Sequence, residues 1–123
     1  MEYEGEYLNG KKHGKGKEYY YFSRLKYEGE YLNGKRNWYG KEYDEYSNNL
    51  KYEGEFMNGE KIGKGKEFDF DGNLIFEGEY FNGEDNKKGK EYDKHGNLIF
   101  EGEYRGREKW NGKGKQYNFL GEL

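Results

Sequence analysis

The chain contains no cysteine and no proline among its 123 residues, and alanine, valine and threonine are also absent. Without cysteine, the fold cannot depend on disulfides, and no thiolate is available as a nucleophile or metal ligand. No apolar run approaches the roughly 20 residues that a transmembrane helix requires. The first residues have neither a basic start nor an apolar stretch, so no signal peptide is visible. We therefore expect a cytoplasmic location, with or without association with a membrane or the cytoskeleton.

An excess of basic charge is also missing. The 22 Lys and Arg residues are outnumbered by 25 Asp and Glu residues, which gives a formal net charge of −3. Proteins that coat nucleic acid are usually clearly basic, because phosphate contacts dominate their affinity. We therefore do not expect nucleic acid as a partner.

Aliphatic residues are scarce, but aromatic residues are not. Only 19 residues are Leu, Ile, Val or Phe, and 38% of the chain is charged, a composition that is typical of disorder. Disordered chains, however, combine high net charge with few aromatics. Here the charges nearly cancel, 20% of residues are aromatic, and Tyr alone occurs 15 times. We expect a folded chain in which Tyr and Phe supply the core.

Two short blocks recur along the whole chain. Tyr/Phe-Glu-Gly-Glu-Tyr/Phe recurs every 24 or 25 residues, and its first residues are Tyr3, Tyr27, Tyr52, Phe76 and Phe100. Asn-Gly follows the first four copies, at residues 9–10, 33–34, 58–59 and 82–83. The second block, Gly-Lys-Glu/Gln-Tyr/Phe, begins at Gly16, Gly40, Gly65, Gly89 and Gly114. The spacing predicts a single domain over 1–123 with five repeats, of which the last is atypical and could cap the array.

Each block alternates with the period of two that is typical of a strand. Pairing Gly5 with Gly16 places Glu4 opposite Lys17 and Glu6 opposite Lys15. A two-residue turn at 71–72 gives the same arrangement between repeats, with Gly65 opposite Gly78, Lys66 opposite Glu77 and Lys64 opposite Glu79, and residues 95–96 occupy the equivalent place. Because opposite charges across strands stabilise a sheet, these registers predict one continuous antiparallel meander of about ten strands.

The other face of this meander would carry aromatic rings beside paired glycines. Glycine lets another group approach the backbone closely, so rings could lie flat on the glycine pairs. The predicted track consists of Tyr3, Tyr7, Tyr27, Tyr31, Tyr52, Phe56, Phe76, Tyr80, Phe100 and Tyr104. The track could be core alone, or core and binding surface together.

The pattern Tyr-x-Gly-x-aromatic, then Asn-Gly, then Gly-Lys-Gly resembles the MORN-repeat family over almost the whole chain. The family's usual Trp at the fifth repeat position is Tyr or Phe here, and the Gly before the Lys-Gly step is Trp38 in one copy and Lys87 in another. The resemblance implies an all-β, elongated, twisted, single-layered sheet. It also implies protein–protein contact, dimerisation, scaffolding or phospholipid binding.

We expect an interaction or scaffolding module that recognises a protein partner, or a second copy of the chain, through the aromatic track. Trp38 and Trp110 are the expected anchors, because they interrupt the repeat and Trp is favoured at the energetic centres of interfaces. The Met at position 1 and the altered last repeat are expected of a complete protein rather than of an appendage to an enzyme.

The alternative is a peripheral phosphoinositide-binding module. Basic residues occur beside the predicted hairpin turns, where the fold would gather them on one edge near anionic lipid. They are Lys11, Lys12, Lys35, Arg36, Lys87, Lys88, Arg105 and Arg107.

Catalytic and metal sites are not expected. His13 and His95 lie in different kinds of turn, and Ser23 and Ser47 have no histidine near them in the repeat. Residues 69–73, Asp-Phe-Asp-Gly-Asn, lack the further acidic ligands and the closing Glu of a calcium loop, and a hairpin turn accounts for them. The prediction is a non-enzyme without cofactor or metal.

Overall fold

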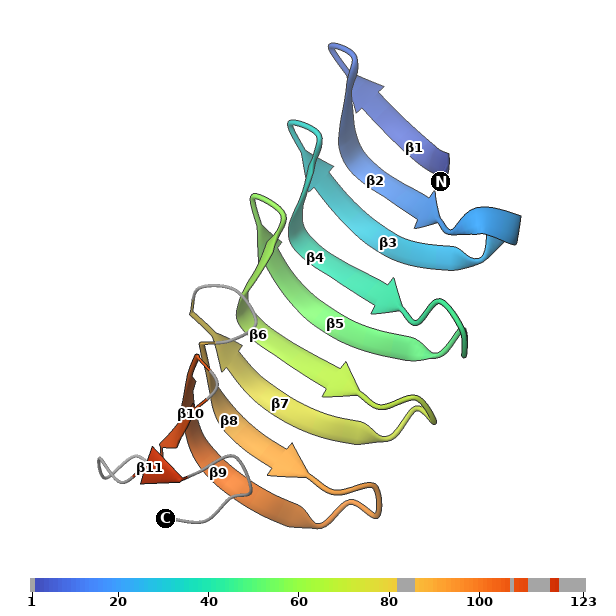
Figure 1. Ribbon diagram of the computed structural model, residues 1–123. Coiled ribbons are helices and arrows are strands. Elements are labelled where there is room, and N and C mark those ends of the chain that lie inside the picture. Colours follow the sequence, from blue (N-terminus) through green and yellow to red (C-terminus); the bar gives the residue numbers. More distant parts are fainter. Residues whose placement is uncertain (1, 82–85, 107, 111–115, 118–123) are drawn as a thin grey trace.

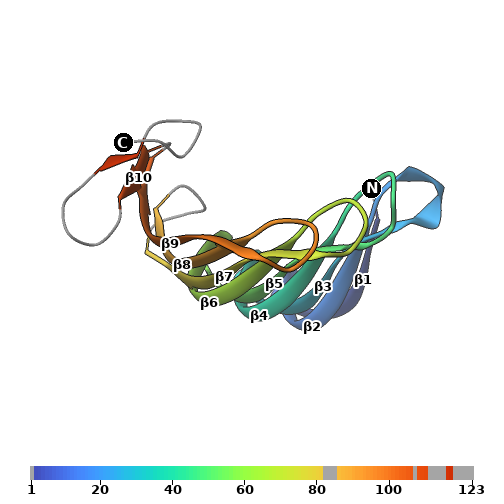
Figure 2. The same ribbon diagram turned by 90° about the horizontal axis from the view of Figure 1, so that it is seen from below.

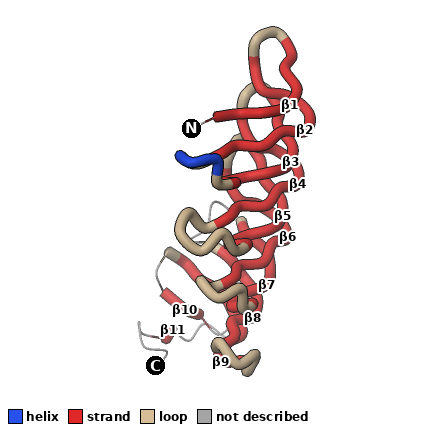
Figure 3. Tube along the Cα trace, turned by 90° about the vertical axis from the view of Figure 1, so that its right-hand side faces the viewer, coloured by secondary structure: helices blue, strands red, loops and turns tan. Residues whose placement is uncertain are grey.

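The computed structural model is a single antiparallel sheet in which every strand pairs only with its neighbours in the sequence (Figure 1). It describes residues 2–81, 86–106, 108–110 and 116–117. Within these residues the sheet has eleven strands in the order β1 to β11. The predicted all-β meander is confirmed, and the described residues form no second layer over either face in the views of Figures 2 and 3.

The strands are evenly distributed along the chain. Their bounds are β1 Glu2–Leu8, β2 Lys11–Tyr19, β3 Leu25–Leu32, β4 Lys35–Tyr43, β5 Leu50–Met57, β6 Glu60–Phe68, β7 Leu74–Tyr80, β8 Lys87–Tyr92, β9 Leu98–Arg105, β10 Glu108–Trp110 and β11 Gln116–Tyr117. A short 3₁₀ helix, η1 Tyr21–Ser23, lies between β2 and β3.

Three hairpins close through the Asn-Gly pairs. Asn9, Asn33 and Asn58 have φ of 52°, and the glycines that follow them also have positive φ. Two successive residues with positive φ form the type I′ turn, whose twist matches that of the flanking strands. The turns therefore fix the strand ends directly, and these hairpins lie along one edge of the sheet (Figure 1).

The central glycines align across nine strands. Gly5, Gly16, Gly29, Gly40, Gly54, Gly65, Gly78, Gly89 and Gly102 pair successively from β1 to β9. Glu4 lies opposite Lys17, Lys66 opposite Glu77 and Lys64 opposite Glu79, as predicted. The predicted registers around the glycines are therefore confirmed at these positions.

The predicted pairing of Glu6 with Lys15 is wrong. Tyr7 pairs with Lys12, so three residues of β2 lie opposite the single residue Glu6 and form a bulge. The Lys15 N–H in this bulge donates to Glu6 Oε2 over 2.9 Å. The carboxylate of Glu6 thus satisfies a backbone amide that the ladder would leave unpaired.

The predicted two-residue turn at 71–72 is also wrong. β6 ends at Phe68 and β7 begins at Leu74, so the connection has five residues, and a register shift beside Phe68 preserves the glycine pairing. The Asp69 carboxylate accepts the N–H groups of Asp71 and Asn73 over 3.0 and 2.9 Å. Asp side chains stabilise turns in this way. The equivalent connection after Asp93 has the same bonds to His95 and Asn97.

The connections between repeats lie along the edge opposite the hairpins (Figure 3). Neighbouring connections are bonded to each other, since Asn49 Nδ2 donates to Phe70 O over 2.7 Å and Arg24 donates to Glu45 O over 2.9 Å. At the other end of the sheet, β10 pairs with residues 103–105 of β9 and turns away from the direction of β1–β9 (Figures 1 and 2).

Candidate interaction surface

One face of the sheet carries a continuous row of aromatic rings, which we call the ring face. Nine edge-to-face contacts, with centroid distances of 5.1 to 6.0 Å, join all ten residues of the predicted track. The order of contact is Tyr7, Tyr3, Tyr31, Tyr27, Phe56, Tyr52, Tyr80, Phe76, Tyr104 and Phe100. Each such pair contributes about 0.5–1.5 kcal/mol beyond its buried area.

The ring row forms the core of the protein. Six of its members, Tyr27, Tyr31, Tyr52, Phe56, Phe76 and Tyr80, are 0–3% exposed, and Tyr3 and Tyr104 pack against them. Only Tyr7, beside the first hairpin, is largely exposed, at 60%. Because the described residues form no second layer over these rings, other groups must shield them from solvent. The glycines beneath the rings and the charged side chains above them do so.

The first Tyr of each of the first three repeats lies over a glycine pair. A Cβ atom placed on Gly16, Gly40 or Gly65 would lie 2.1–2.8 Å from the ring and hydroxyl atoms of Tyr3, Tyr27 or Tyr52. The hydroxyls of these three tyrosines donate to the carbonyls of Glu6, Glu30 and Glu55. The predicted flat packing of rings on glycine is present in these repeats, and it excludes any side chain at the glycine positions.

Cations cover the outer side of the ring row. The Arg36 guanidinium carbon lies 4.1 Å from the Tyr27 centroid, and Lys61 Nζ lies 4.5 Å from that of Tyr52. Lys87 Nζ lies 4.3 Å from the Phe76 centroid. Lys12 and Lys109 take the equivalent positions over Tyr3 and Phe100. Partly buried cations over rings are held more strongly than exposed ones.

Carboxylates fix these cations in place. Arg36 is bonded to both Glu18 and Glu42, at 3.3 and 2.5 Å, and therefore links two successive repeats. Lys87 contacts Glu67 over 2.7 Å, and Lys109 contacts Glu91 over 3.2 Å. The hydroxyls of Tyr31 and Tyr80 donate to Glu18 and Glu67. Burial disfavours the ionised form of Glu18, but the bonds from Tyr31 and Arg36 outweigh it and lower its pKa.

Raising the pH above about 10, the ordinary pKa of Tyr, is expected to unfold the sheet. Burial, together with nearby carboxylates, raises the pKa of Tyr27, Tyr31 and Tyr52 above that value. A pKa that is higher in the folded state gives stability that is complete below the unfolded value and is lost above it. Tyrosinate absorbance and far-UV circular dichroism should therefore change together. Complete phenol ionisation with an intact sheet spectrum would contradict this.

The opposite face, which we call the ladder face, carries the residues immediately before and after each of the nine aligned glycines. They form two rows across the strands, with ten Glu, seven Lys and Tyr39. Within the described residues, none of these seven lysines takes part in a close ion pair. The close ion pairs of the described residues lie mainly on the ring face. The lysines of the ladder face are therefore available to a partner.

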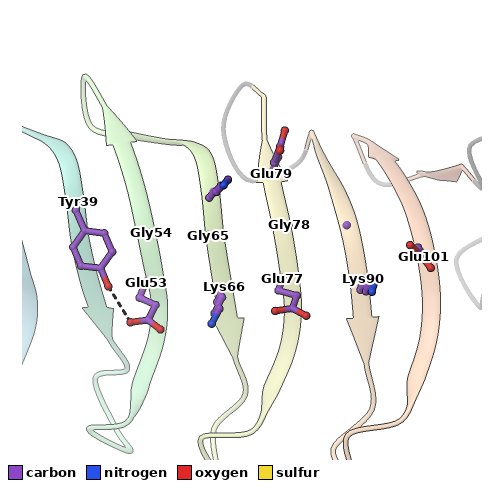
Figure 4. A pocket seen from close by; sticks show the side chains of 12 residues that line it. Tyr39, Glu53, Gly54, Gly65, Lys66, Glu77, Gly78, Glu79, Lys90 and Glu101 are labelled. Atoms are coloured by element: carbon purple, nitrogen blue, oxygen red, sulfur yellow. Dashed lines mark hydrogen bonds between the residues drawn. The ribbon is translucent and has the colours of Figure 1, made fainter.

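Two shallow cavities lie between the rows of the ladder face. Their volumes are about 600 Å³ over β4–β9 and about 690 Å³ over β1–β4, and Tyr39 lines both. Figure 4 shows Tyr39 beside the alternating Glu and Lys side chains of the first cavity, with its hydroxyl directed at Glu53. That hydroxyl donates to Glu53 Oε2 over 3.1 Å. Together the two cavities form a groove across the sheet.

Comparison with known protein families finds a match in each of the first three repeats. The MORN repeat profile matches residues 3–21, 27–44 and 52–74. The chain belongs to the MORN-repeat family. A comparison with curated proteins finds no match to this chain. MORN repeats are non-catalytic modules that contact proteins or membranes. The strand pairing of β7–β9 continues that of the matched repeats, and the count of five MORN copies stays a prediction.

The basic residues predicted for lipid binding are divided between two environments. Lys12, Arg36 and Lys87 lie over the rings, whereas Lys11, Lys35 and Lys88 are exposed at the beginnings of β2, β4 and β8. Arg105 donates to Glu103. Arg107 and the side chain of Trp110 lie outside the described residues.

Metal and membrane signals are absent from the described part of the chain. No group of three or more His, Cys, Asp or Glu residues there could hold a metal ion. None of the helices described is long and apolar enough to cross a membrane.

Trp38 is the main departure from the MORN pattern on the described surface. It has φ of 68°, where the equivalent residues Gly14 and Gly63 have 65° and 66°. A bulky residue in this left-handed region is a steric outlier. Trp38 is nevertheless 51% exposed, and the adjacent Tyr39, at 46%, replaces the Lys of the other matched repeats. Sequence reasoning identified Trp38 but missed Tyr39, although its place in the Lys row is visible from the repeat alone.

Replacing Trp38 with glycine is expected to raise the free energy of unfolding by about 1 kcal/mol, because it removes left-handed strain from a half-exposed residue. Gly63→Ala is the matched control. It introduces a side chain at φ of 66°, with Cβ 2.7 Å from Glu55 Oε2, and should lower stability. Urea unfolding measures both changes. A less stable Trp38→Gly protein would show that the indole contributes to packing.

Proposed function

We propose that this MORN-repeat chain is a single-domain, non-catalytic protein-interaction module whose contact surface centres on Trp38 and Tyr39. The observation that supports it is an exposed pair of aromatic residues at a position where the other matched repeats have Gly-Lys. One member of the pair has a strained backbone. Strain that packing does not require is typical of functional positions, and Trp and Tyr are favoured in interface centres.

The ring face supports this function indirectly. Because most of its rings are buried beneath cations, they hold successive repeats in place and leave Tyr7 as their exposed member. A partner that contacts the sheet therefore meets the ladder face and the Trp38–Tyr39 pair. That partner is a different protein or a second copy of the chain.

A peptide-display selection tests this function across many partner sequences at once. Immobilised wild-type protein is used to select from a random twelve-residue library, and a double variant, Trp38→Gly with Tyr39→Lys, is selected in parallel. The variant restores the residues of the first and third repeats at both positions. We expect peptides that bind the wild-type protein and not the variant. Identical peptide sets from the two proteins would reject the proposed surface.

Light scattering decides whether a second copy is the partner. If the chain associates with itself through this surface, the wild-type protein should be a dimer and the double variant a monomer. A dimer that persists in the variant would place self-association elsewhere in the sheet.

Phospholipid binding is the second candidate, and exposed Lys11 and Lys35 beside two neighbouring hairpins favour it. The next hairpin has Glu60 in the same place, and Lys12 and Arg36 are held over rings. Flotation with liposomes that contain phosphoinositide, at moderate salt, separates the two functions. We expect the protein to remain in the unbound fraction. Recruitment that Lys11→Glu and Lys35→Glu abolish would instead establish the lipid function.

A further inference from the structure

The groove of the ladder face has a net charge of known sign. The residues that line its two cavities include seven carboxylates and six ammonium groups, and Tyr39 takes the place of a further Lys. The excess of carboxylates favours a basic partner. Several of these carboxylates already accept one hydrogen bond within the sheet, as Glu4 does from Tyr19 and Glu28 from Tyr43, but a carboxylate has about four lone-pair sites and can accept further bonds from a partner.

The dimensions of the groove restrict the conformation of that partner. Side chains on one face of a strand are about 7 Å apart, so the space between the rows is too narrow for an α-helix about 10 Å across. Strands are about 4.8 Å apart, so carboxylates recur in each row about every 9.6 Å, the width of two strands. A polyproline II helix has three residues per turn and a rise of about 3.1 Å, which gives a repeat of about 9.3 Å.

The similar repeat distances of the carboxylates and of the polyproline II helix predict the sequence pattern of the partner. In a polyproline II segment that lies across the strands, every third residue would return to the same row and meet successive carboxylates. A β-strand in the same place would return every 6.6–6.8 Å and lose the register within one repeat. The matching pattern is therefore a basic residue at every third position, with proline between.

Tyr39 provides the aromatic surface that such a segment requires. Proline-rich peptides bind in grooves lined with aromatic side chains, because their conformation is preformed and loses little entropy. Tyr39 is fixed at the centre of the groove by its hydroxyl bond to Glu53, and its N–H donates to Glu30 Oε2 over 3.2 Å. Trp38 precedes Tyr39 in the bulge opposite Glu30 and lines neither cavity, so Tyr39 is the aromatic residue of the groove.

We propose that the groove of the ladder face binds a proline-rich segment in the polyproline II conformation, with an arginine or lysine at every third residue and proline packed on Tyr39. This inference rests on the proposed function and names the class of partner for the same surface.

Calorimetry with three synthetic peptides tests the pattern. Twelve residues of Pro-Pro-Arg repeats span about 37 Å, which matches the roughly 38 Å across nine strands. The first control has the same composition with the four arginines adjacent, and the second has Glu in place of Arg. We expect the regular peptide to bind, the clustered peptide to bind roughly tenfold more weakly, and the Glu peptide not to bind. Equal binding of the regular and clustered peptides would overturn the inference.

A matched pair of variants locates the site. Tyr39→Lys should weaken binding of the regular peptide by roughly tenfold, because it removes the ring and adds a positive charge. Tyr46→Lys makes the same chemical change at a residue that is 76% exposed in a connection between repeats, and should leave binding unchanged. Equal effects of both variants would also overturn the inference. If display yields Trp38-dependent peptides but the regular peptide does not bind, the proposed function stands and this partner class is wrong.

Discussion

Replacing Tyr27 with alanine is expected to lower the free energy of unfolding by about 4 kcal/mol, the loss typical of a fully buried aromatic residue. Tyr27 is 0% exposed and contacts Tyr31 and Phe56 at centroid distances of 5.4 and 5.5 Å. The substitution also removes the ring beneath Arg36, which would then lie over a cavity. Denaturant unfolding followed by circular dichroism measures the loss.

Tyr46→Ala is the control for this prediction. It removes the same side chain from a residue that is 76% exposed, and the free energy should change by less than about 0.5 kcal/mol. Similar losses from the two substitutions would mean that the ring row is not the core. Tyr27→Phe separates the ring from its hydroxyl, whose 3.3 Å bond to Glu30 O should contribute about 1 kcal/mol.

Gly40→Ala is expected to cost about 3 kcal/mol, even though it adds only one methyl group. The three atoms nearest to the new Cβ, at 2.1 to 2.4 Å, all belong to the Tyr27 side chain. Because Tyr27 is enclosed by other rings, it cannot move aside without disturbing them. The backbone of Gly40 does not itself require glycine, since its φ is not positive.

A double-mutant cycle tests whether the clash with the Tyr27 side chain causes the loss of stability in Gly40→Ala. In the Tyr27→Ala protein, Gly40→Ala should cost less than about 1 kcal/mol, because the atoms with which it clashes are gone. Stability is measured by urea unfolding of the four proteins in parallel. Additive losses from the two substitutions would show that the glycine is required for another reason, such as the close approach of the Gly29 backbone.

The strand order and register could be predicted because two independent patterns agree on them. Glycines at the centres of the strands and the alternation of Glu with Lys both specify the same pairing, and they recur five times. The bulge at Glu6 could not be predicted this way. The carboxylate's bond to the Lys15 N–H depends on three-dimensional closure of the hairpin, whereas simple alternation places Glu6 opposite Lys15.

Sequence reasoning did not predict that cations cover the ring face, although the repeat contains a pattern that indicates it. Lys12, Arg36 and Lys61 each follow an Asn-Gly turn by two residues, and Glu18 and Glu42 occupy one place in successive repeats. Such residues are usually solvated, and only the stacking of repeats brings Arg36 between two carboxylates. Tyr39 was also missed, although it stands before the central glycine where the first and third repeats have Lys15 and Lys64.

The order of the strands has a mechanical consequence. Tension applied between β1 and β9 would act perpendicular to the strands, because each is bonded only to its neighbours in the chain. The interstrand bonds would then be loaded one row at a time rather than in parallel, so the sheet should open in steps at low force. Each repeat of about 24 residues would release roughly 80 Å of chain. Force spectroscopy should record this series, in which case the protein extends under load as a compliant tether; a single rupture at high force would contradict it.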